Sequence, residues 1–223
     1  TDNLVLNLDA GNIKSYAGDV PTPAGTSYGY FGGGYGGSPA ANLTTVSRID
    51  FDNDTATAVA KGPLSNDGFP KASAGSFSYG YFSGGETSPG SYPTSTLRLD
   101  YSSDTSTTAV KGPLSAVNRR SHAAVGNNSY GYHCAGPGIS SVDRIDYSND
   151  TAAASPKGPL SAAKWYLCAT GNQSYGYIGG GHPGPYSTVD RIDYSSDTPT
   201  ASPKGPLSVA RYNGGATGNA SYG

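Results

Sequence analysis

Charged residues, cysteines and long apolar runs are scarce in this chain, and methionine is absent. Only 13% of the 223 residues are charged, and the net charge at neutral pH is −2. Without a basic excess the surface cannot neutralise phosphates, so we expect no nucleic-acid partner. No apolar stretch approaches the ~18 residues that cross a bilayer, so we expect no membrane span. Because helical periodicity is also missing, a helical-repeat architecture is excluded.

The two cysteines, Cys134 and Cys168, stand at non-equivalent places in the sequence. Two cysteines do not make a disulfide framework, so either a single bridge or two small buried thiols is compatible with the sequence. The chain begins at Thr1, shows no signal-peptide pattern, and ends just after a repeat phrase starts at Ser221. We therefore expect a processed protein or part of a longer one.

Glycine (33 residues) and tyrosine (18 residues) are abundant and recur in phrases about 50 residues apart. The phrase Ser-Tyr-Gly-Tyr starts at Ser27, Ser78, Ser129 and Ser174. An Arg-x-Asp phrase follows each time, and then Lys-Gly-Pro-Leu-Ser, which starts at Lys61, Lys111, Lys157 and Lys204. Such a regular period indicates stacked copies of one supersecondary unit.

The third copy predicts four short strands. Residues 123–125 and 129–134 flank a tight turn, residues 141–147 follow a glycine-rich loop, and residues 152–155 form a weaker last strand. Pro156 and Pro159 fit an outer edge or a crossing loop. Four-stranded antiparallel sheets that repeat in this way are typical of β-propeller blades.

The sequence therefore predicts an all-β fold, a propeller with four blades in this chain. Its units are expected at about 27–77, 78–128, 129–173 and 174–223, after an extension at residues 1–26. Leu4, Leu6 and Leu8 alternate there and predict one extra strand. We expect Tyr212–Thr217 to close the ring as the innermost strand of the first blade; a longer chain with more blades is the alternative.

The repeat resembles the kelch family over about residues 27–220. The resemblance rests on glycine clusters after the second strand and on a Gly-Pro-Leu-Ser stretch that precedes an arginine and a His-Ala-Ala-Val strand. In this sequence they are Gly32–Gly34, Gly84–Gly85, Gly179–Gly181, Gly112–Ser115, Arg119 and His122–Val125. The tryptophan that kelch repeats place after the turn is missing, since Trp165 stands elsewhere, so we carry over only the fold.

Residues 4–12 with Ser15 and Tyr16 resemble the opening of concanavalin-like domains in bacteriophage structural proteins. The near-identical blades likewise resemble repeat-containing structural proteins of marine bacteriophages. What these resemblances imply is a class alone, a component of a virion or of an extracellular surface.

An arginine and an aspartate recur two residues apart in each copy. Residues i and i+2 of a strand face the same side, so each pair predicts an ionic contact between blades. An anion site is the alternative. The pairs are Arg48 with Asp50, Arg98 with Asp100, Arg144 with Asp146, and Arg191 with Asp193.

A second aspartate follows four residues after the first, as in Asp100 and Asp104. The spacing differs from an EF-hand, and Asp-Thr at the end of each turn suits capping by side-chain hydrogen bonds, although calcium remains an alternative. The three histidines, His122, His133 and His182, occupy different positions, so we expect no metal and no cofactor. No catalytic arrangement stands out, and galactose oxidase, a kelch-type enzyme, has a copper centre without a counterpart in this sequence.

The Tyr-Gly-Tyr phrase places two tyrosines on one face of a strand and predicts packing between blades, where the glycine permits a close approach. Aromatic residues in the loops are the candidate binding residues because they vary between units on a fixed scaffold. They are Tyr35, Tyr92, Trp165 and Tyr186.

These observations favour a non-enzymatic structural or attachment protein, displayed on a virion or cell surface as a homo-oligomer or with other surface proteins. Its loops would meet copies of itself or a host glycan. The alternative is a lectin with one shallow sugar site per blade. A degraded kelch oxidase or a glycosidase ranks last, because residues repeated in every blade do not mark one catalytic centre.

Overall fold

The computed structural model describes residues 28–37, 39–69, 71–219 and 221–222. The extension predicted at residues 1–26, with its extra strand, lies outside these residues. The described chain is all-β: it forms antiparallel sheets joined by loops, and its helices are two single 3-10 turns. No helix in these residues is long and apolar enough to cross a membrane.

The sheets follow one another along the chain, and we call them units 1 to 4. Unit 1 contains β1 (Tyr28–Gly32), β4 (Val46–Asp50) and β5 (Val59–Lys61), and a small hairpin inside it contains β2 (Tyr35–Gly36) and β3 (Ala41–Asn42). Unit 2 contains β6 (Ala72–Gly75), β7 (Tyr79–Ser83), β8 (Thr96–Asp100) and β9 (Ala109–Lys111).

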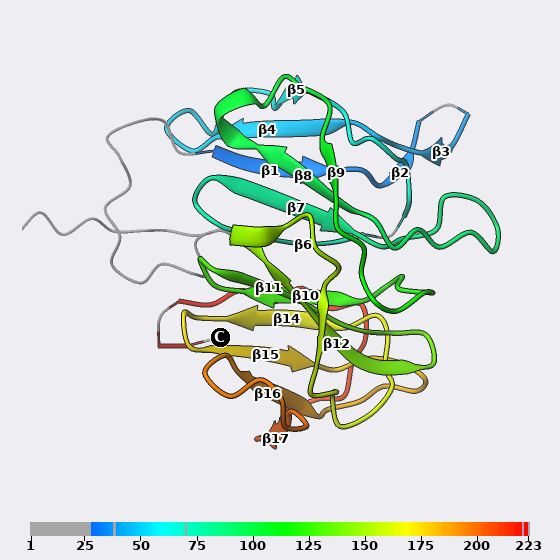
Figure 1. Ribbon diagram of the computed structural model, residues 1–223, viewed down its shortest axis with the longest axis vertical. Helices are drawn as coiled ribbons and strands as arrows, with labels where there is room; N and C mark the ends of the chain where they lie inside the picture. Colours follow the sequence, from blue (N-terminus) through cyan, green and yellow to red (C-terminus); the bar gives the residue numbers. More distant parts are fainter. Residues whose placement is uncertain (1–27, 38, 70, 220, 223) are drawn as a thin grey trace, which may run out of the picture.

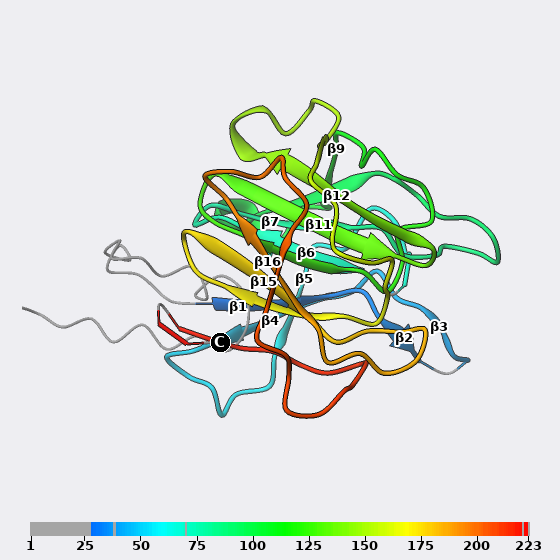
Figure 2. The ribbon, with the colours of Figure 1, turned by 90° about the horizontal axis from the view of Figure 1, so that it is seen from below.

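Units 3 and 4 repeat the order of unit 2. Unit 3 contains β10 (Ala123–Gly126), β11 (Tyr130–Gly136), β12 (Ile139–Asp146) and β13 (Ser155–Lys157). Unit 4 contains β14 (Cys168–Gly171), β15 (Tyr175–Gly179), β16 (Val189–Asp193) and β17 (Ser202–Lys204). The units lie side by side in chain order, with unit 1 and unit 4 at opposite ends of the long axis (Figure 1). Figure 2 shows the same sheets from the unit 4 end.

The last strand of unit 3 differs from the prediction. In unit 3 it runs over Ser155–Lys157 and not over residues 152–155, and Pro156 pairs with Asp143 on β12. A proline is tolerated there because β13 is an edge strand, where one missing N–H leaves no ladder partner unsatisfied. The outer edge thus begins after the turn, at the residues that lead into Lys-Gly-Pro-Leu-Ser.

The predicted closing strand, Tyr212–Thr217, is wrong for the described chain. These residues form no strand, and unit 1 has three strands there. The backbone N–H of Asn213 donates to the carbonyl of Tyr166 at 2.9 Å, and the Tyr212 ring lies 5.5 Å from that of His182. These contacts hold the segment beside unit 4.

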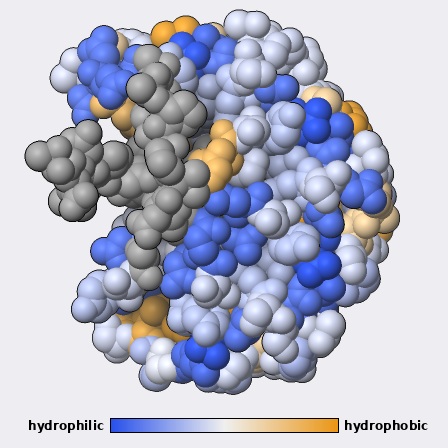
Figure 3. Space-filling model, turned by 60° about the vertical axis from the view of Figure 1, so that its left-hand side comes forward, coloured by the Kyte–Doolittle hydropathy of each residue, from blue (hydrophilic) through white to orange (hydrophobic). Residues whose placement is uncertain are grey.

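The apolar core lies between successive sheets. Val46, Leu64, Phe82, Leu97 and Leu99 pack between units 1 and 2. A larger cluster between units 3 and 4 includes Val125, Tyr132, Val142, Ile178 and Ile192. The face on the left of Figure 1 carries mostly hydrophilic and neutral side chains with small scattered apolar groups (Figure 3). Burial therefore stabilises the contacts between units.

Each joint between units is centred on one buried carboxylate. At Asp150 of unit 3, Tyr81 donates its hydroxyl hydrogen bond at 3.0 Å, and Arg98 and Lys111 form ion pairs at 2.8 and 3.1 Å. Burial alone would raise the pKa of Asp150, but the hydrogen bonds from Lys111, Tyr81 and Arg98 outweigh it and hold the pKa below its usual value. Equivalent contacts surround Asp104 and Asp197.

The arginines predicted to join the blades do reach the next unit, but the aspartate in the prediction was wrong. Asp100 caps its own turn, since its Oδ1 accepts from the N–H and the hydroxyl of Ser102 at 2.9 and 2.6 Å. The equivalent aspartates of the other units also accept hydrogen bonds from the N–H groups of their own turns, so their predicted contacts between blades are wrong as well. They are Asp50, Asp146 and Asp193. Arg191 has no carboxylate partner among the described residues. The aspartates at the three joints, Asp104, Asp150 and Asp197, each form ion pairs with an arginine and a lysine, so they do not offer calcium ligands.

The Tyr-Gly-Tyr phrase contributes to the same joints. Tyr81 stacks on Tyr147 of unit 3 with ring centroids 4.6 Å apart. Gly80 lies under the turn tyrosine of its own unit, because a Cβ at this position would come within 2.8 Å of the Tyr101 hydroxyl oxygen. The absence of a side chain at Gly80 therefore allows Tyr101 to pack against the sheet of unit 2. The ring of Tyr101 also stacks on Tyr30 of unit 1, with ring centroids 4.9 Å apart.

Candidate functional site

The segments that connect one unit to the next carry different side chains at one equivalent position. The segments that follow units 2, 3 and 4 pass over the glycine-rich loop of the unit they leave, where the N–H groups of Gly85, Gly136 and Gly181 donate to their backbone. The residue after the accepting carbonyl is aromatic or an arginine, and so is the equivalent residue before unit 2. These residues are Phe69, Arg120, Trp165 and Tyr212. A constant backbone with variable side chains is typical of recognition loops.

Three of these four side chains line one cavity of about 310 Å³. The cavity opens among the glycine-rich loops and connecting segments, and its volume lies at the low end of small-ligand sites. The lining residues, which we call the loop pocket, are Phe69, Glu86, Arg120, Ser121, Pro137, Trp165 and Tyr166.

An ion pair between Glu86 and Arg120 forms the polar part of the loop pocket. The N–H of Gly90 donates to the other carboxylate oxygen of Glu86 at 2.9 Å. This backbone hydrogen bond, followed by the Arg120 guanidinium, lowers the pKa of Glu86. The guanidinium also lies 5.0 Å from the centre of the Tyr92 ring. Glu86 is therefore ionised at neutral pH, and both of its carboxylate oxygens are held by hydrogen bonds.

Aromatic rings form the apolar part. Trp165 packs edge-on against His182 with ring centroids 4.8 Å apart. Tyr166 is 39% exposed and Phe69 41% exposed. Exposed rings beside an ion pair can contact the apolar face of a ligand while the charged groups bind its hydroxyls.

The backbone at the pocket is strained. Ser121 and Tyr166 have φ angles of 50° and 55°, in the left-handed region that side-chain-bearing residues rarely adopt. The N–H of Tyr166 donates to the carbonyl of Ser121 at 2.7 Å and fixes the two connections against each other. Such conformations persist where the surrounding structure imposes them, and they cluster at functional sites.

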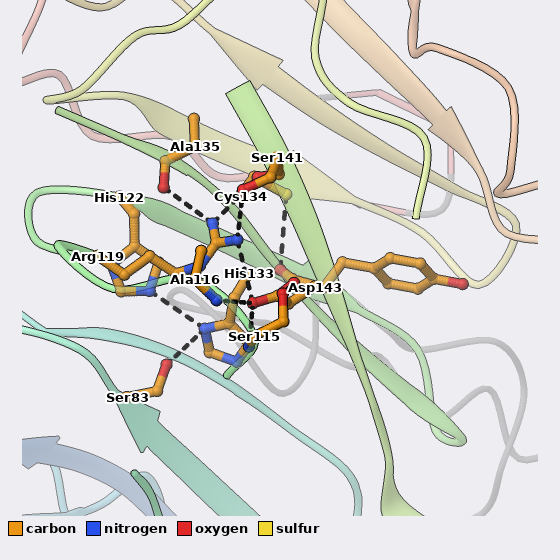
Figure 4. Close-up of polar contacts among 11 residues, drawn as sticks. Ser83, Ser115, Ala116, Arg119, His122, His133, Cys134, Ala135, Ser141 and Asp143 are labelled. Atoms are coloured by element: carbon orange, nitrogen blue, oxygen red, sulfur yellow. Dashed lines mark hydrogen bonds and ion pairs between the residues drawn. The ribbon is translucent and has the colours of Figure 1, made fainter. Parts of the chain in front are cut away.

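A buried polar cluster lies under the Arg120 connection (Figure 4). Arg119 donates to the carbonyls of Ala135 and Ser141 at 2.9 and 3.0 Å and pairs with Asp143 at 3.1 Å. Asp143 also accepts from the N–H and hydroxyl of Ser115. Because Arg119 points inward and is fixed at several atoms, the next residue, Arg120, is directed outward to Glu86.

The same cluster contains two neighbouring histidines that the sequence had placed apart. His122 Nε2 lies 3.2 Å from His133 Nδ1, which also lies 2.6 Å from the Ser83 hydroxyl. Burial is the main cause that lowers both pKa values, that of His133 to about 3, and the Arg119 charge adds to it. Both imidazoles are therefore neutral, and they anchor the inner side of the connection.

The Ser83–His133 contact does not supply a nucleophile to a ligand, because both side chains are 0% exposed. Among the described residues, histidine, cysteine and acidic side chains form no group of three that could hold a metal ion. Both cysteines are free, and burial raises the pKa of Cys134 to about 12. The single disulfide considered from the sequence is thus absent.

Of the four aromatic residues predicted to bind, only Trp165 lies on a connection between units, whereas the other three lie inside units 1, 2 and 4. Trp165 lines the loop pocket. Tyr92 lies beside Arg120, Tyr35 lies 6.1 Å from Phe69 between ring centres, and Tyr186 pairs through its backbone with Arg211. Sequence reasoning missed Phe69 and Arg120, and aligning each connection on the following strand could have found them.

Comparison with known proteins supports the fold alone. No protein-family model matches the chain, and the search of curated proteins finds no match. The chain is similar to a solved structure, YjhT, with a TM-score of 0.69 and 12% sequence identity. The similarity covers 86% of this chain and 72% of that chain. At this identity the likeness extends to the all-β architecture and not to the residues of the loop pocket.

Proposed function

We propose that the four units are blades of a kelch-like β-propeller and that the chain is a non-enzymatic attachment protein. The supporting observations are the four sheets in chain order, the shared carboxylate joint, and glycine-rich loops that support connections with variable side chains. In a propeller, radially arranged blades present their loops for recognition.

The ligand we propose is a glycan, and the observation that carries this proposal is the composition of the loop pocket. Phe69 and Tyr166 provide exposed ring surface for the apolar face of a sugar, and the half-buried Trp165 adds a third ring. The Glu86 carboxylate accepts hydrogen bonds and the Arg120 guanidinium donates them, so together they match the hydroxyls of a sugar edge.

The pocket favours one composite site over one shallow site in every blade. A sugar site repeated in each blade needs the same side chains at equivalent positions, whereas these positions carry phenylalanine, arginine, tryptophan and tyrosine. Binding of one glycan per chain is therefore expected. A stoichiometry of one per blade would favour the alternative, a lectin with repeated sites.

The setting we propose is a virion or an extracellular surface, where host glycans are the partners. This part of the proposal rests on the resemblance to phage repeat proteins and on the mostly uncharged surface. Its test is localisation of the protein on purified particles or cells with an antibody against the folded chain.

A glycan array followed by calorimetry with the strongest-binding glycan tests the recognition itself. We expect Trp165→Ala to weaken binding by roughly tenfold or more, because it removes an aromatic face. Phe31→Ala is the matched control, since Phe31 is an exposed ring on β1 outside the loop pocket. Equal binding by wild type and Trp165→Ala, or an array without any bound glycan, would refute the proposal.

A further inference from the structure

The connections before units 3 and 4 are each held by a buried ion pair. Arg119 pairs with Asp143 at 3.1 Å, and Lys164 pairs with Asp190 at 3.0 Å, with every one of these side chains at most 1% exposed. The cation stands four residues before the first strand of its unit, and the carboxylate lies on the third strand, β12 or β16. Both connections are therefore fixed to the sheet that follows them.

The connection before unit 2 lacks this pair. Gly68 stands where the cations stand, and Leu97, which is 0% exposed, stands on β8 where the carboxylates stand. Lys71 takes the space of the missing side chain, since a Cβ on Gly68 would lie 2.9 Å from its Nζ atom. Among the described residues Lys71 forms no ion pair, so its amine is held by uncharged groups.

Two carbonyl oxygens hold the Lys71 amine. Its Nζ atom donates to the backbone carbonyl of Gly84 at 3.0 Å and to the side-chain Oδ1 of Asn66 at 2.5 Å. Burial lowers the pKa of Lys71 to about 8, although the charge of Asp67 opposes the shift. Roughly a tenth of the molecules therefore carry the neutral amine at pH 7, and the neutral amine is the nucleophilic form of lysine.

The Asn66 amide is fixed beside this amine at both of its polar atoms. Its Nδ2 donates to the Ser95 hydroxyl at 3.3 Å, and its Oδ1 also accepts from the N–H of Gly68 at 3.4 Å. Donors on Oδ1 stabilise the negative charge that develops on this oxygen when a nucleophile adds to the carbon that carries it. That carbon, Cγ, is bonded to Oδ1 and so lies next to the Lys71 amine.

We propose that Lys71 and Asn66 form an isopeptide bond within the chain. Nζ of the neutral amine adds to Cγ of Asn66, and the bond between Cγ and Nδ2 breaks. Nδ2 leaves as ammonia after taking the proton that Nζ gives up, and the Ser95 hydroxyl is placed to relay this proton. The reaction consumes no further reagent. Because neighbouring groups held in contact reach effective concentrations of about 10⁵ M or more, a slow attack on an amide becomes feasible.

The bond would fasten the connection before unit 2 covalently, where the other connections use ion pairs. It links two residues five apart and so restrains Phe69, which lies between them and lines the loop pocket. The backbone of Phe69 also exchanges hydrogen bonds with that of Glu86, at 3.1 and 2.9 Å. The bond thus stiffens one wall of the pocket, but the inference does not depend on glycan binding there.

Mass spectrometry of the folded protein after prolonged incubation at pH 8 tests the bond directly. The intact mass is expected to fall below the sequence mass by one ammonia, about 17 Da. Trypsin is expected to leave Lys71 uncut, so residues 62–98 appear as one peptide with the same deficit, and fragmentation places the link between Asn66 and Lys71. This peptide map of the wild type decides the question even where a variant fails to fold.

Lys71→Arg and Asn66→Ala are expected to keep the full sequence mass, because each removes one partner of the bond. Lys61→Arg is the matched control and is expected to show the wild-type deficit, since Lys61 pairs with Asp104 at 3.3 Å. Wild type incubated in urea is expected to keep its full mass, because unfolding separates the two groups.

A succinimide formed between Asn66 and the backbone nitrogen of Asp67 would also release one ammonia, so the two products have to be distinguished. Hydroxylamine cleaves a succinimide and leaves an isopeptide bond intact. A wild-type protein that keeps its full sequence mass would overturn the proposal. A deficit that persists in Lys71→Arg, disappears with hydroxylamine or forms equally in urea would overturn it as well.

Discussion

The joints between units and the loop pocket are built on the same repeated backbone, yet they differ in how their side chains vary. At the joints, a tyrosine, an arginine and a lysine recur around a buried aspartate. At the connections, one position carries Phe69, Arg120, Trp165 or Tyr212. Uniform side chains are what a stack of equivalent sheets requires, whereas variable side chains make one place on the molecule chemically distinct. Repeated side chains therefore hold neighbouring units together, and the positions that depart from the repeat are the candidates for recognition.

The largest effect on stability is expected from removing the carboxylate of a joint. Asp150→Ala removes the shared acceptor and leaves Arg98 and Lys111 without their carboxylate, so we expect a loss of roughly 3 kcal/mol in the free energy of unfolding. Asp54→Ala, at the equivalent position without a partner, is expected to change it by less than about 0.5 kcal/mol. Urea unfolding of both variants checks this difference. Equal effects would mean that the joint carboxylates do not hold the units.

Two glycine substitutions test how closely the connection between units 2 and 3 approaches the glycine-rich loop of unit 2. Gly84 and Gly90 both have positive φ, at 69° and 81°, but a Cβ on Gly84 would lie 2.1 Å from the carbonyl oxygen of Arg119, while nothing lies near Gly90. Gly90→Ala is expected to cost about 1 kcal/mol for the backbone conformation alone. Gly84→Ala is expected to cost about 2 kcal/mol or more, because it also displaces the connection. Thermal melts of both variants measure the difference, and equal melting temperatures would contradict the close approach.

Much of the fold could be predicted from the sequence because short-range chemistry decides it. Tight turns, alternation and the phrase period predicted the strands of unit 3 to within a few residues, apart from the edge strand. The joint partner could not be predicted, because Asp100 and Asp104 are both near the arginine in sequence, and only the packing of the next unit shows which carboxylate is used. Phe69 and Arg120 were missed for another reason, because the segments had not been aligned on the strand that follows each of them.

The two buried histidines make the free energy of unfolding depend on pH. Burial lowers the pKa of His122 and His133 in the folded state, so the unfolded chain binds more protons between about pH 6.5 and the lower folded values. Stability therefore falls as the pH decreases below about 6.5, by up to about 1.4 kcal/mol per pH unit for each histidine. The joint aspartates, Asp104 and Asp150, also have lowered pKa values and act further down, below about pH 4.

Urea unfolding at pH 7 and pH 5 measures this effect. The wild type is expected to lose stability over this interval, and His133→Gln is expected to lose less, since a glutamine does not titrate. If the variant and the wild type lost the same amount, the buried histidines would not be the cause.

Trp165 allows the most direct test of the loop pocket as the recognition site, since it is the single tryptophan of the chain and lines the cavity. The measurement is its fluorescence, with acrylamide quenching, during titration with the strongest-binding glycan from the array. A ligand in the loop pocket is expected to shift the emission and to protect Trp165 from the quencher, with the same midpoint as in calorimetry. Calorimetric binding that leaves both the emission and the quenching of Trp165 unchanged would contradict the assignment of recognition to this pocket.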